Sequence, residues 1–149
     1  MDKEQILEYC LTHLPGTIVS DSWGETGVFY NPNSGLKRGI YLLTIKNKDG
    51  AHDKSSILNR EGVFRLNICI RKSTFLKLFG SIPHRPLAGQ VVDMPYDFSE
   101  SDTMLPHPVY AWMGWICVLN PSDKKFEQLK PLISEAYELA IEKYLKRRK

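Results

Sequence analysis

The chain contains a histidine held between two prolines, Pro106-His107-Pro108. Proline restricts the residue before it to extended backbone, so this spacing predicts a rigidly oriented imidazole at His107. An imidazole titrates near neutral pH, which suits it to general acid–base catalysis or to ligand binding. In the catalytic interpretation, Asp102 would orient the ring. In the structural alternative, His107 hydrogen-bonds a backbone carbonyl where a strand begins.

Arg65 and Asn67 lie two residues apart in a segment with strand character, so both side chains are expected on one face of a sheet. A guanidinium beside an amide offers several donors to a carboxylate or a phosphate. The alternative is a buried Arg65 neutralised by an acid from residues 93–102, such as Asp102. Both interpretations predict that Arg65 is held in place.

Three tryptophans are candidates for core packing or for the walls of a pocket. Trp112 and Trp115 are three residues apart, so on a strand they would face opposite sides, one in the core and one toward a pocket. Trp23, beside Gly24, is a candidate second wall. Ligand pockets are largely apolar with a few placed polar groups. The predicted ligand-binding residues are therefore Trp23, Arg65, Asn67, His107 and Trp115.

No catalytic residue, cofactor or metal site is predicted. His52-Asp53 resembles a metal-binding dyad, but no second His-Asp pair with suitable spacing follows it. The sequence also lacks a P-loop, GxGxxG, GxSxG and HExxH, so nucleotide hydrolysis, dinucleotide chemistry and triad hydrolysis have no support.

Cysteine usage and hydropathy indicate the compartment. The three cysteines are far apart and each lies among apolar residues, which predicts reduced, buried thiols: Cys10, Cys69 and Cys117. The N-terminal residues MDKEQILEYC lack the apolar core of a signal peptide, and no apolar run approaches the ~20 residues that span a bilayer. We therefore expect a cytoplasmic protein without a membrane partner.

The formal charge of +3 is distributed unevenly. Residues 1–36 carry a net charge of −4, residues 37–77 carry +7 and residues 78–142 carry −5. The last seven residues hold five bases, and without them 15 bases and 17 acids give −2. The basic middle segment is a candidate nucleic-acid surface, with solvated surface cations as the alternative. The basic terminus is expected to stabilise the negative end of a helix.

The length of 149 residues and the composition, 42% hydrophobic and 25% charged, are typical of one soluble globular domain, expected over residues 1–149. They exclude collagen, coiled coil and wholesale disorder. Apolar periodicity predicts helices at residues 3–14, capped by Asp2; 73–78, capped by Ser73; 122–130; and 131–145, beginning at Pro131. Strands are expected at residues 17–20, 28–30, 40–45, 63–70 and 109–119, with 87–92 a further candidate and a turn at 24–27.

These elements define an α+β fold class, with an antiparallel sheet, an N-terminal helix and C-terminal helices packed on it. Within residues 63–70, Phe64, Leu66, Ile68 and Ile70 would share one face of the sheet. Arg65, Asn67 and Cys69 would share the other, where they could meet His107.

Two long runs carry a resemblance: SILNREGVFRLN at residues 56–67 and PHPVYAWMGWICVLNP at residues 106–121. The chain resembles a bacterial family of uncharacterised domains over nearly its whole length. More distantly it is similar to the YjbR/MmcQ-like proteins, through the Leu14-Pro15-Gly16 that ends the first helix, a late Trp-bearing strand and Tyr137. That similarity implies a compact α+β domain.

Three hypotheses for the function follow. The first is a non-catalytic binding module for a small anionic ligand or a peptide, since polar residues are placed among aromatic ones and no catalytic signature is present. The alternative is nucleic-acid binding through residues 37–77 and the C-terminal tail, whose affinity would fall steeply with salt. The second alternative is an enzyme that uses His107 as acid or base.

Overall fold

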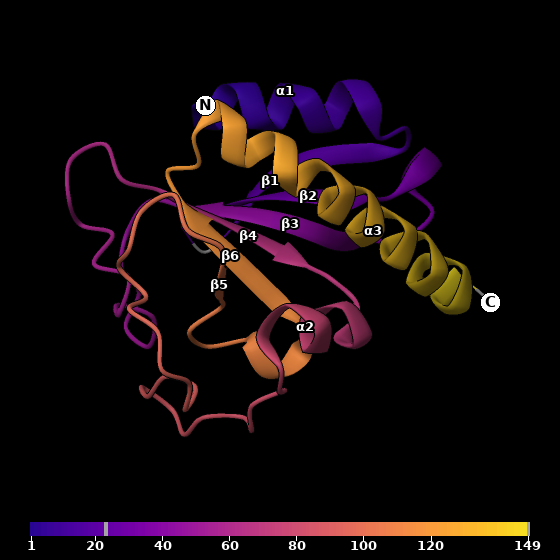
Figure 1. Cartoon of the computed structure of the whole chain (residues 1–149). Helices are drawn as coiled ribbons and strands as arrows, with labels where there is room; N and C mark the ends of the chain where they lie inside the picture. Colours follow the sequence, from indigo (N-terminus) through magenta and orange to yellow (C-terminus); the bar gives the residue numbers. More distant parts are fainter. Residues whose placement is uncertain (23, 149) are drawn as a thin grey trace.

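The computed structural model describes residues 1–22 and 24–148. In the part it describes, six strands form an antiparallel sheet in the order β1-β2-β3-β4-β6-β5 (Figure 1). The strands are β1 Thr17–Ser22, β2 Glu25–Tyr30, β3 Ile40–Lys46, β4 Arg65–Cys69, β5 Leu105–Pro106 and β6 Trp115–Leu119. The helices are α1 Lys3–His13, α2 Lys72–Phe79 and α3 Asp123–Arg148, with 3-10 turns η1 Pro32–Ser34 and η2 Ala111–Met113. The predicted single-domain α+β fold with an antiparallel sheet is confirmed.

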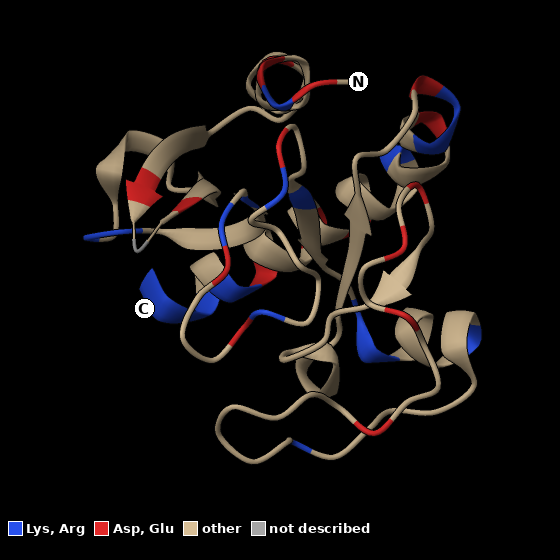
Figure 2. Ribbon diagram, turned by 90° about the vertical axis from the view of Figure 1, so that its left-hand side faces the viewer, with Lys and Arg blue, Asp and Glu red and all other residues tan. Residues whose placement is uncertain are grey.

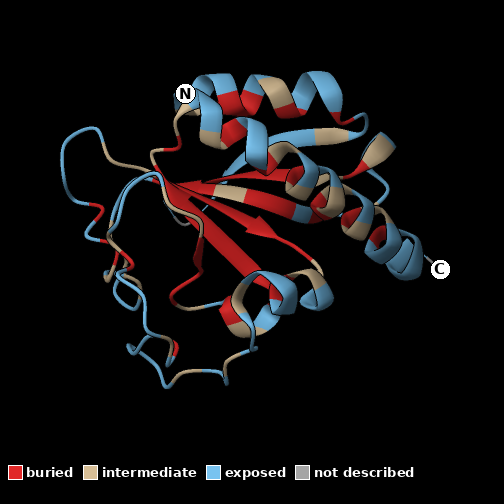
Figure 3. Ribbon diagram, in the orientation of Figure 1, coloured by how far each residue is buried: buried red, intermediate tan, exposed pale blue. Residues whose placement is uncertain are grey.

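One face of the sheet is apolar and carries the core. Successive strand residues point to opposite faces, and Leu66, Ile68 and Val118 point to this one, where all three are fully buried. The helices α1 and α3 cover it together (Figures 1 and 3). They also contact each other through Tyr9 and Phe126, whose ring centroids lie 5.3 Å apart.

The opposite face of the central strands is polar. Arg65 and Asn67 point to it from β4, and in the strand register they lie beside Lys46 and Thr44 of β3. The loop between β3 and β4 and the segment around His107 cover this face, through hydrogen bonds and contacts with Arg65. The predicted division of β4 into an apolar and a polar face is confirmed.

A β-bulge between β2 and β3 places an aromatic residue on the polar face. The register shifts so that Val28 pairs with Leu43 but Phe29 pairs with Tyr41. The extra residue, Leu42, gives two consecutive buried leucines, as expected where a bulge interrupts the alternation. Tyr41 is thereby left half-exposed beside Phe29, away from the core.

The predicted long strand over residues 109–119 is wrong in its first half, since β6 begins only at Trp115 and Trp112 lies in η2. Trp112 and Trp115 therefore do not lie on the same strand. Gly114 has φ +91°, which ends η2 in the left-handed region, and a Cβ there would meet the Ile70 carbonyl oxygen at 2.7 Å. Apolar composition alone does not reveal this break between η2 and β6.

The prediction of a strand at residues 87–92 is also wrong, because that segment is irregular.

The C-terminal region forms one helix rather than the predicted two, and Pro131 lies inside α3. Proline removes the hydrogen bond to the carbonyl four residues earlier, here that of Glu127. Both Pro131 and Glu127 are exposed, so water can take the place of that bond. Leu129 and Ile133, on either side of the proline, are fully buried, so both halves of the helix are held by packing in the core.

Two other local predictions are wrong. The predicted cap Ser73 lies inside α2, whose N-cap is Arg71 without a side-chain hydrogen bond. The predicted turn at residues 24–27 is shorter, since β2 already begins at Glu25. By contrast, Asp2 caps α1 as predicted, in a capping box that satisfies free N–H groups of the first turn.

Candidate functional site

A buried polar cluster lies on β4, centred on Arg65, which is 0% exposed. Its two terminal nitrogens donate to the two carboxylate oxygens of Asp53 at 2.9 and 2.5 Å. Nη1 also donates to Ser56 Oγ at 3.0 Å, and Nε donates to Asn67 Oδ1 at 2.7 Å. Asn67 in turn donates from Nδ2 to Thr44 Oγ1 at 3.0 Å. The cluster thus ties β3, β4 and the loop between them together.

The partner of Arg65 differs from the predicted one. It is Asp53, from the His52-Asp53 pair of the loop before β4, and not Asp102, so that prediction is wrong. Burial alone would raise the pKa of the Asp53 carboxyl, but the hydrogen bonds and charge of Arg65 outweigh it and bring the pKa below its ordinary value. Asp53 is therefore ionised at neutral pH, and the pair neutralises a charge inside the protein.

His107 is 3% exposed and is surrounded by hydrogen-bond donors. The backbone N–H groups of Val109 and Tyr110 donate to its Nδ1 at 3.1 and 3.0 Å. Two donors at Nδ1 assign the proton of the neutral ring to Nε2, which lies 3.2 Å from Nη2 of Arg65. Burial, followed by the charge of Arg65, holds the pKa of His107 well below its ordinary value of 6.5. The ring is therefore neutral, and its lone pair is already engaged.

Asp102 does not orient His107, so that prediction is wrong. The Asp102 N–H donates to the Leu119 carbonyl, whereas the His107 N–H donates to the Trp115 carbonyl. These two carbonyl groups belong to the residues at opposite ends of β6. Because a β-strand rises by about 3.3 Å per residue, the two ends of β6 lie about 13 Å apart. The Asp102 carboxylate instead accepts the Ser122 N–H at 2.7 Å.

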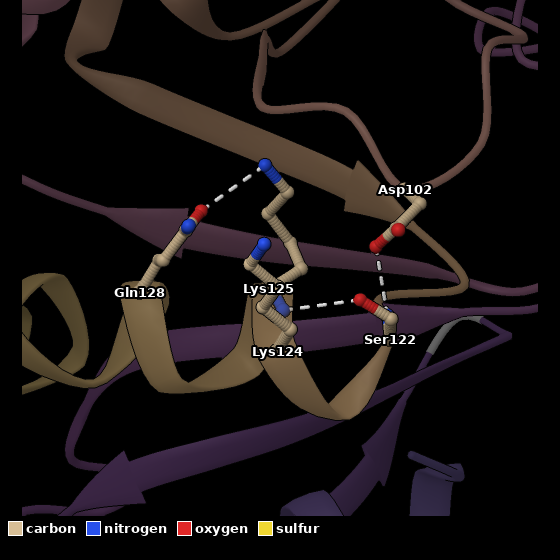
Figure 4. Close-up of a pocket in the computed structure, with 5 residues that line it drawn as sticks. All are labelled: Asp102, Ser122, Lys124, Lys125 and Gln128. Carbon is tan, nitrogen blue, oxygen red and sulfur yellow. Dashed lines mark hydrogen bonds between the residues drawn. The ribbon is translucent and has the colours of Figure 1, made fainter.

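A hollow of about 260 Å³ beside Asp102 belongs to the cap of α3 (Figure 4). Ser122 Oγ accepts the Lys125 N–H at 3.0 Å, and Lys125 Nζ donates to Gln128 Oε1 at 3.2 Å. Together with the Asp102–Ser122 bond, these contacts satisfy polar groups at the start of the helix. The polar groups that line this hollow are therefore used in capping α3.

A larger pocket, of about 520 Å³, lies on the polar face of the sheet. Strands β1, β2 and β3 form one wall, and residues 107–115 supply His107, Tyr110, Met113 and Trp115 to the other. The loop before β3 and the end of α3 contribute to its rim. A concave volume of this size is typical of sites for small molecules.

The pocket brings together two of the predicted site residues, His107 and Trp115. Arg65 and Asn67 are fully buried and do not line it. Each contacts a residue that does, since Arg65 lies against His107 and Asn67 holds Thr44. They therefore support the floor of the pocket from below. Trp23, the fifth predicted residue, lies outside the described residues.

The charged residues of the pocket are mainly cationic. Arg38 and Arg147 line it, and neither forms an ion pair within residues 1–22 and 24–148. The acid in the lining, Glu25, lies 3.7 Å from Nζ of buried Lys46, which offsets its charge. An anionic group in the pocket would therefore meet two guanidinium groups.

Sequence reasoning missed Arg38, Tyr41, Tyr110 and Arg147 as site residues. Tyr41 lies in a correctly predicted strand, but the bulge that sets its direction leaves no mark in the pattern. Arg38 and Arg147 come from the basic segment and the basic tail, which are far apart in the sequence. Arg38 and Arg147 come together because the end of α3 lies beside the loop before β3.

The bases of residues 37–77 have different surroundings. Lys46 and Arg65 are buried beside acids, and Arg71 pairs with Glu142 of α3. In Figure 2, Lys and Arg alternate with Asp and Glu over several loops. Nucleic-acid binding through this segment stays a prediction.

The described part of the chain meets neither the requirements of a metal site nor those of a membrane-spanning helix. Within residues 1–22 and 24–148, no group of three or more His, Cys, Asp or Glu side chains is placed to hold a metal ion. Nor is any helix in these ranges long and apolar enough to cross a bilayer. The three cysteines are buried and free, in agreement with prediction. The cytoplasmic location stays a prediction.

The fold and the pocket together define a small α+β domain with an aromatic and cationic pocket on its sheet. The chain belongs to the Family of unknown function (DUF6194), whose sequence pattern matches residues 1–149. No curated protein and no solved structure matches the chain. The bacterial origin and the more distant similarity to YjbR/MmcQ-like proteins stay predictions.

Proposed function

We propose that this protein is a non-catalytic binding module for a small anionic ligand, held in the 520 Å³ pocket on the polar face of the sheet. The observation that carries the proposal is the pair Arg38 and Arg147 at a pocket whose other lining residues are aromatic, glycine or small and polar, apart from Met113 and from Glu25, which faces Lys46. Charge-assisted hydrogen bonds from guanidinium groups to carboxylates or phosphates are among the stronger polar contacts in proteins.

The surroundings of His107 favour binding over catalysis. A general base needs a free lone pair, and Nδ1 of His107 already accepts two backbone N–H groups. A general acid needs a pKa near the working pH, and the pKa of His107 lies well below its ordinary value because the ring is buried beside Arg65. His107 therefore serves as a fixed, neutral part of the pocket floor.

The buried cluster supports this role by fixing the geometry. Four of the five N–H groups of the Arg65 guanidinium donate to Asp53, Ser56 and Asn67, so the side chain cannot turn without breaking several hydrogen bonds. A rigid floor lowers the entropic cost of binding, because fewer side chains have to be ordered with the ligand.

A thermal-shift and calorimetric screen of small anions at constant ionic strength tests the proposal. Ligands that bind only the folded state raise the melting temperature by mass action. We expect at least one organic carboxylate or phosphate to bind, and the double variant R38Q/R147Q to weaken it at least tenfold. The matched control K37Q/R148Q removes the same charge from neighbouring exposed residues outside the pocket and should bind like the wild type.

Two results would overturn the proposal. One is the absence of binding by every anion at millimolar concentration. The other is equal weakening in R38Q/R147Q and K37Q/R148Q, which would show only a general effect of net charge on a surface.

A further inference from the structure

Five rings form a continuous aromatic lining in the pocket. The centroids of Phe29 and Tyr41 lie 5.4 Å apart, and those of Tyr41 and Trp115 lie 5.7 Å apart. His107 continues the series, at 6.4 Å from Trp115 and 5.1 Å from Tyr110. All five residues line the same pocket, although they come from β2, β3, β6 and the segment before β6.

The two tyrosines of this series present uncovered aromatic surface. Tyr41 is 52% exposed and Tyr110 is 46% exposed, whereas Trp115 is only 7% exposed. Their neighbours contact both rings: Tyr41 packs between Phe29 and Trp115, and the Tyr110 ring packs against the ring of His107. Such fixed rings are ready to stack on a flat ligand, because stacking needs little further ordering.

We propose that the ligand is a planar aromatic anion, an aromatic ring that carries a carboxylate or a phosphate ester. This inference rests on the proposed function and specifies the ligand class. The ring stacks on Tyr41 or Tyr110, and the anionic group accepts hydrogen bonds from Arg38 or Arg147. Because both guanidinium groups and all five rings line one pocket, one small molecule can meet both requirements.

The charge of the pocket lining disfavours quaternary ammonium ions, the other class of ligand that aromatic pockets bind. Quaternary ammonium ions are held by ring faces, commonly with no cation nearby. Here the pocket is lined by Arg38 and Arg147, which form no ion pair within the described residues, and the acid in the lining, Glu25, faces buried Lys46 at 3.7 Å. A cationic ligand would be repelled, and an aromatic anion is favoured.

Two-dimensional NMR on the full chain tests the inference. Trp115 lines the pocket, whereas Trp112 lies outside it beside Arg85, so the two indole N–H signals are a site probe and an internal reference. The ligands are benzoate and phenyl phosphate, which separate the two sources of charge. Their controls are cyclohexanecarboxylate, benzamide and benzyltrimethylammonium, which lack planarity, charge or the correct sign of charge.

We expect benzoate or phenyl phosphate to shift the Trp115 indole signal, with a Kd at least tenfold below that of each control. The variant Y41L should remove most of that preference, and Y96L, at an exposed tyrosine outside the pocket, should retain it. Equal affinity for benzoate and cyclohexanecarboxylate would overturn the inference and leave anion binding intact. Binding of none of the five compounds would overturn the inference while the anion screen decides the proposed function separately, and binding of the ammonium ion alone would overturn both.

Discussion

At the scale of single residues, the buried Asp53–Arg65 pair decides whether the pocket floor is stable. Asp53→Asn keeps the shape of the side chain but leaves the positive charge of fully buried Arg65 without a counter-ion. We expect the variant to lose about 3 kcal/mol of stability in urea unfolding, since breaking a buried pair costs roughly 3–5 kcal/mol. Glu127→Gln, which breaks the exposed pair with Lys130, should change stability far less. A similar small change in both variants would contradict this role of Asp53.

A second residue-scale prediction concerns pH. Because burial and then Arg65 depress the pKa of His107, the unfolded chain binds more protons than the folded chain once the pH falls below about 6.5. Stability should therefore be complete above that pH and decrease toward pH 5, by up to about 1.4 kcal/mol per pH unit. Asp53 has a depressed pKa too, but its contribution is lost only below its ordinary value of 3.8.

Urea midpoints measured between pH 7.5 and pH 5 check this dependence. His107→Gln should flatten the decrease, and His84→Gln, at an exposed histidine, should leave it unchanged. Parallel curves for the wild type and H107Q would show that His107 is not the group responsible.

The sequence predicted much of this residue-level arrangement. Alternation in β4 was sufficient to place Arg65 and Asn67 on one face, because one side of the strand is uniformly apolar. The acid partner was not predictable, since Asp53 and the residues from 93 to 102 both lie in loops with no periodicity. Nor did the sequence show that Arg65 is sealed beneath the pocket rather than open to it.

At the scale of elements, the turn before β6 positions the pocket wall. Gly114 ends η2 in the left-handed region, and an added Cβ would meet the Ile70 carbonyl oxygen at 2.7 Å. Gly114→Ala should therefore cost at least about 2 kcal/mol, combining backbone strain with displacement of the segment. Gly62→Ala is the matched control, because Gly62 also has a positive φ but has open space around it. Equal losses of unfolding free energy in the two variants would contradict the steric account.

The helix α3 provides the other element-scale prediction. Pro131 lies in its interior at an exposed position, where alanine would restore one backbone hydrogen bond. Pro131→Ala should raise the free energy of unfolding by at least about 1 kcal/mol, measured by urea denaturation. A loss of stability would show that the helix depends on a local bend at the proline.

Proline also explains why the sequence predicted two helices in this region. The low helix propensity of proline favours a break at Pro131, whereas packing on the sheet keeps α3 continuous.

At the scale of the whole molecule, the uneven charge of the sequence has a structural explanation. Part of the basic middle segment is used internally, as Arg65 and Lys46 lie buried beside Asp53 and Glu25. Arg38, from the same segment, and Arg147, from the basic tail, meet instead at the pocket. The net charge of +3 is therefore a poor guide to the partner, and the positions of two arginines are a better one.

A crystal structure of the protein soaked with phenyl phosphate tests the central claim most directly. The account predicts the phosphate within hydrogen-bonding distance of Arg38 or Arg147, with the phenyl ring against Tyr41 or Tyr110. Phenyl phosphate bound only at other cations of the surface, or an unoccupied pocket at saturating concentration, would contradict the claim that this pocket is the ligand site.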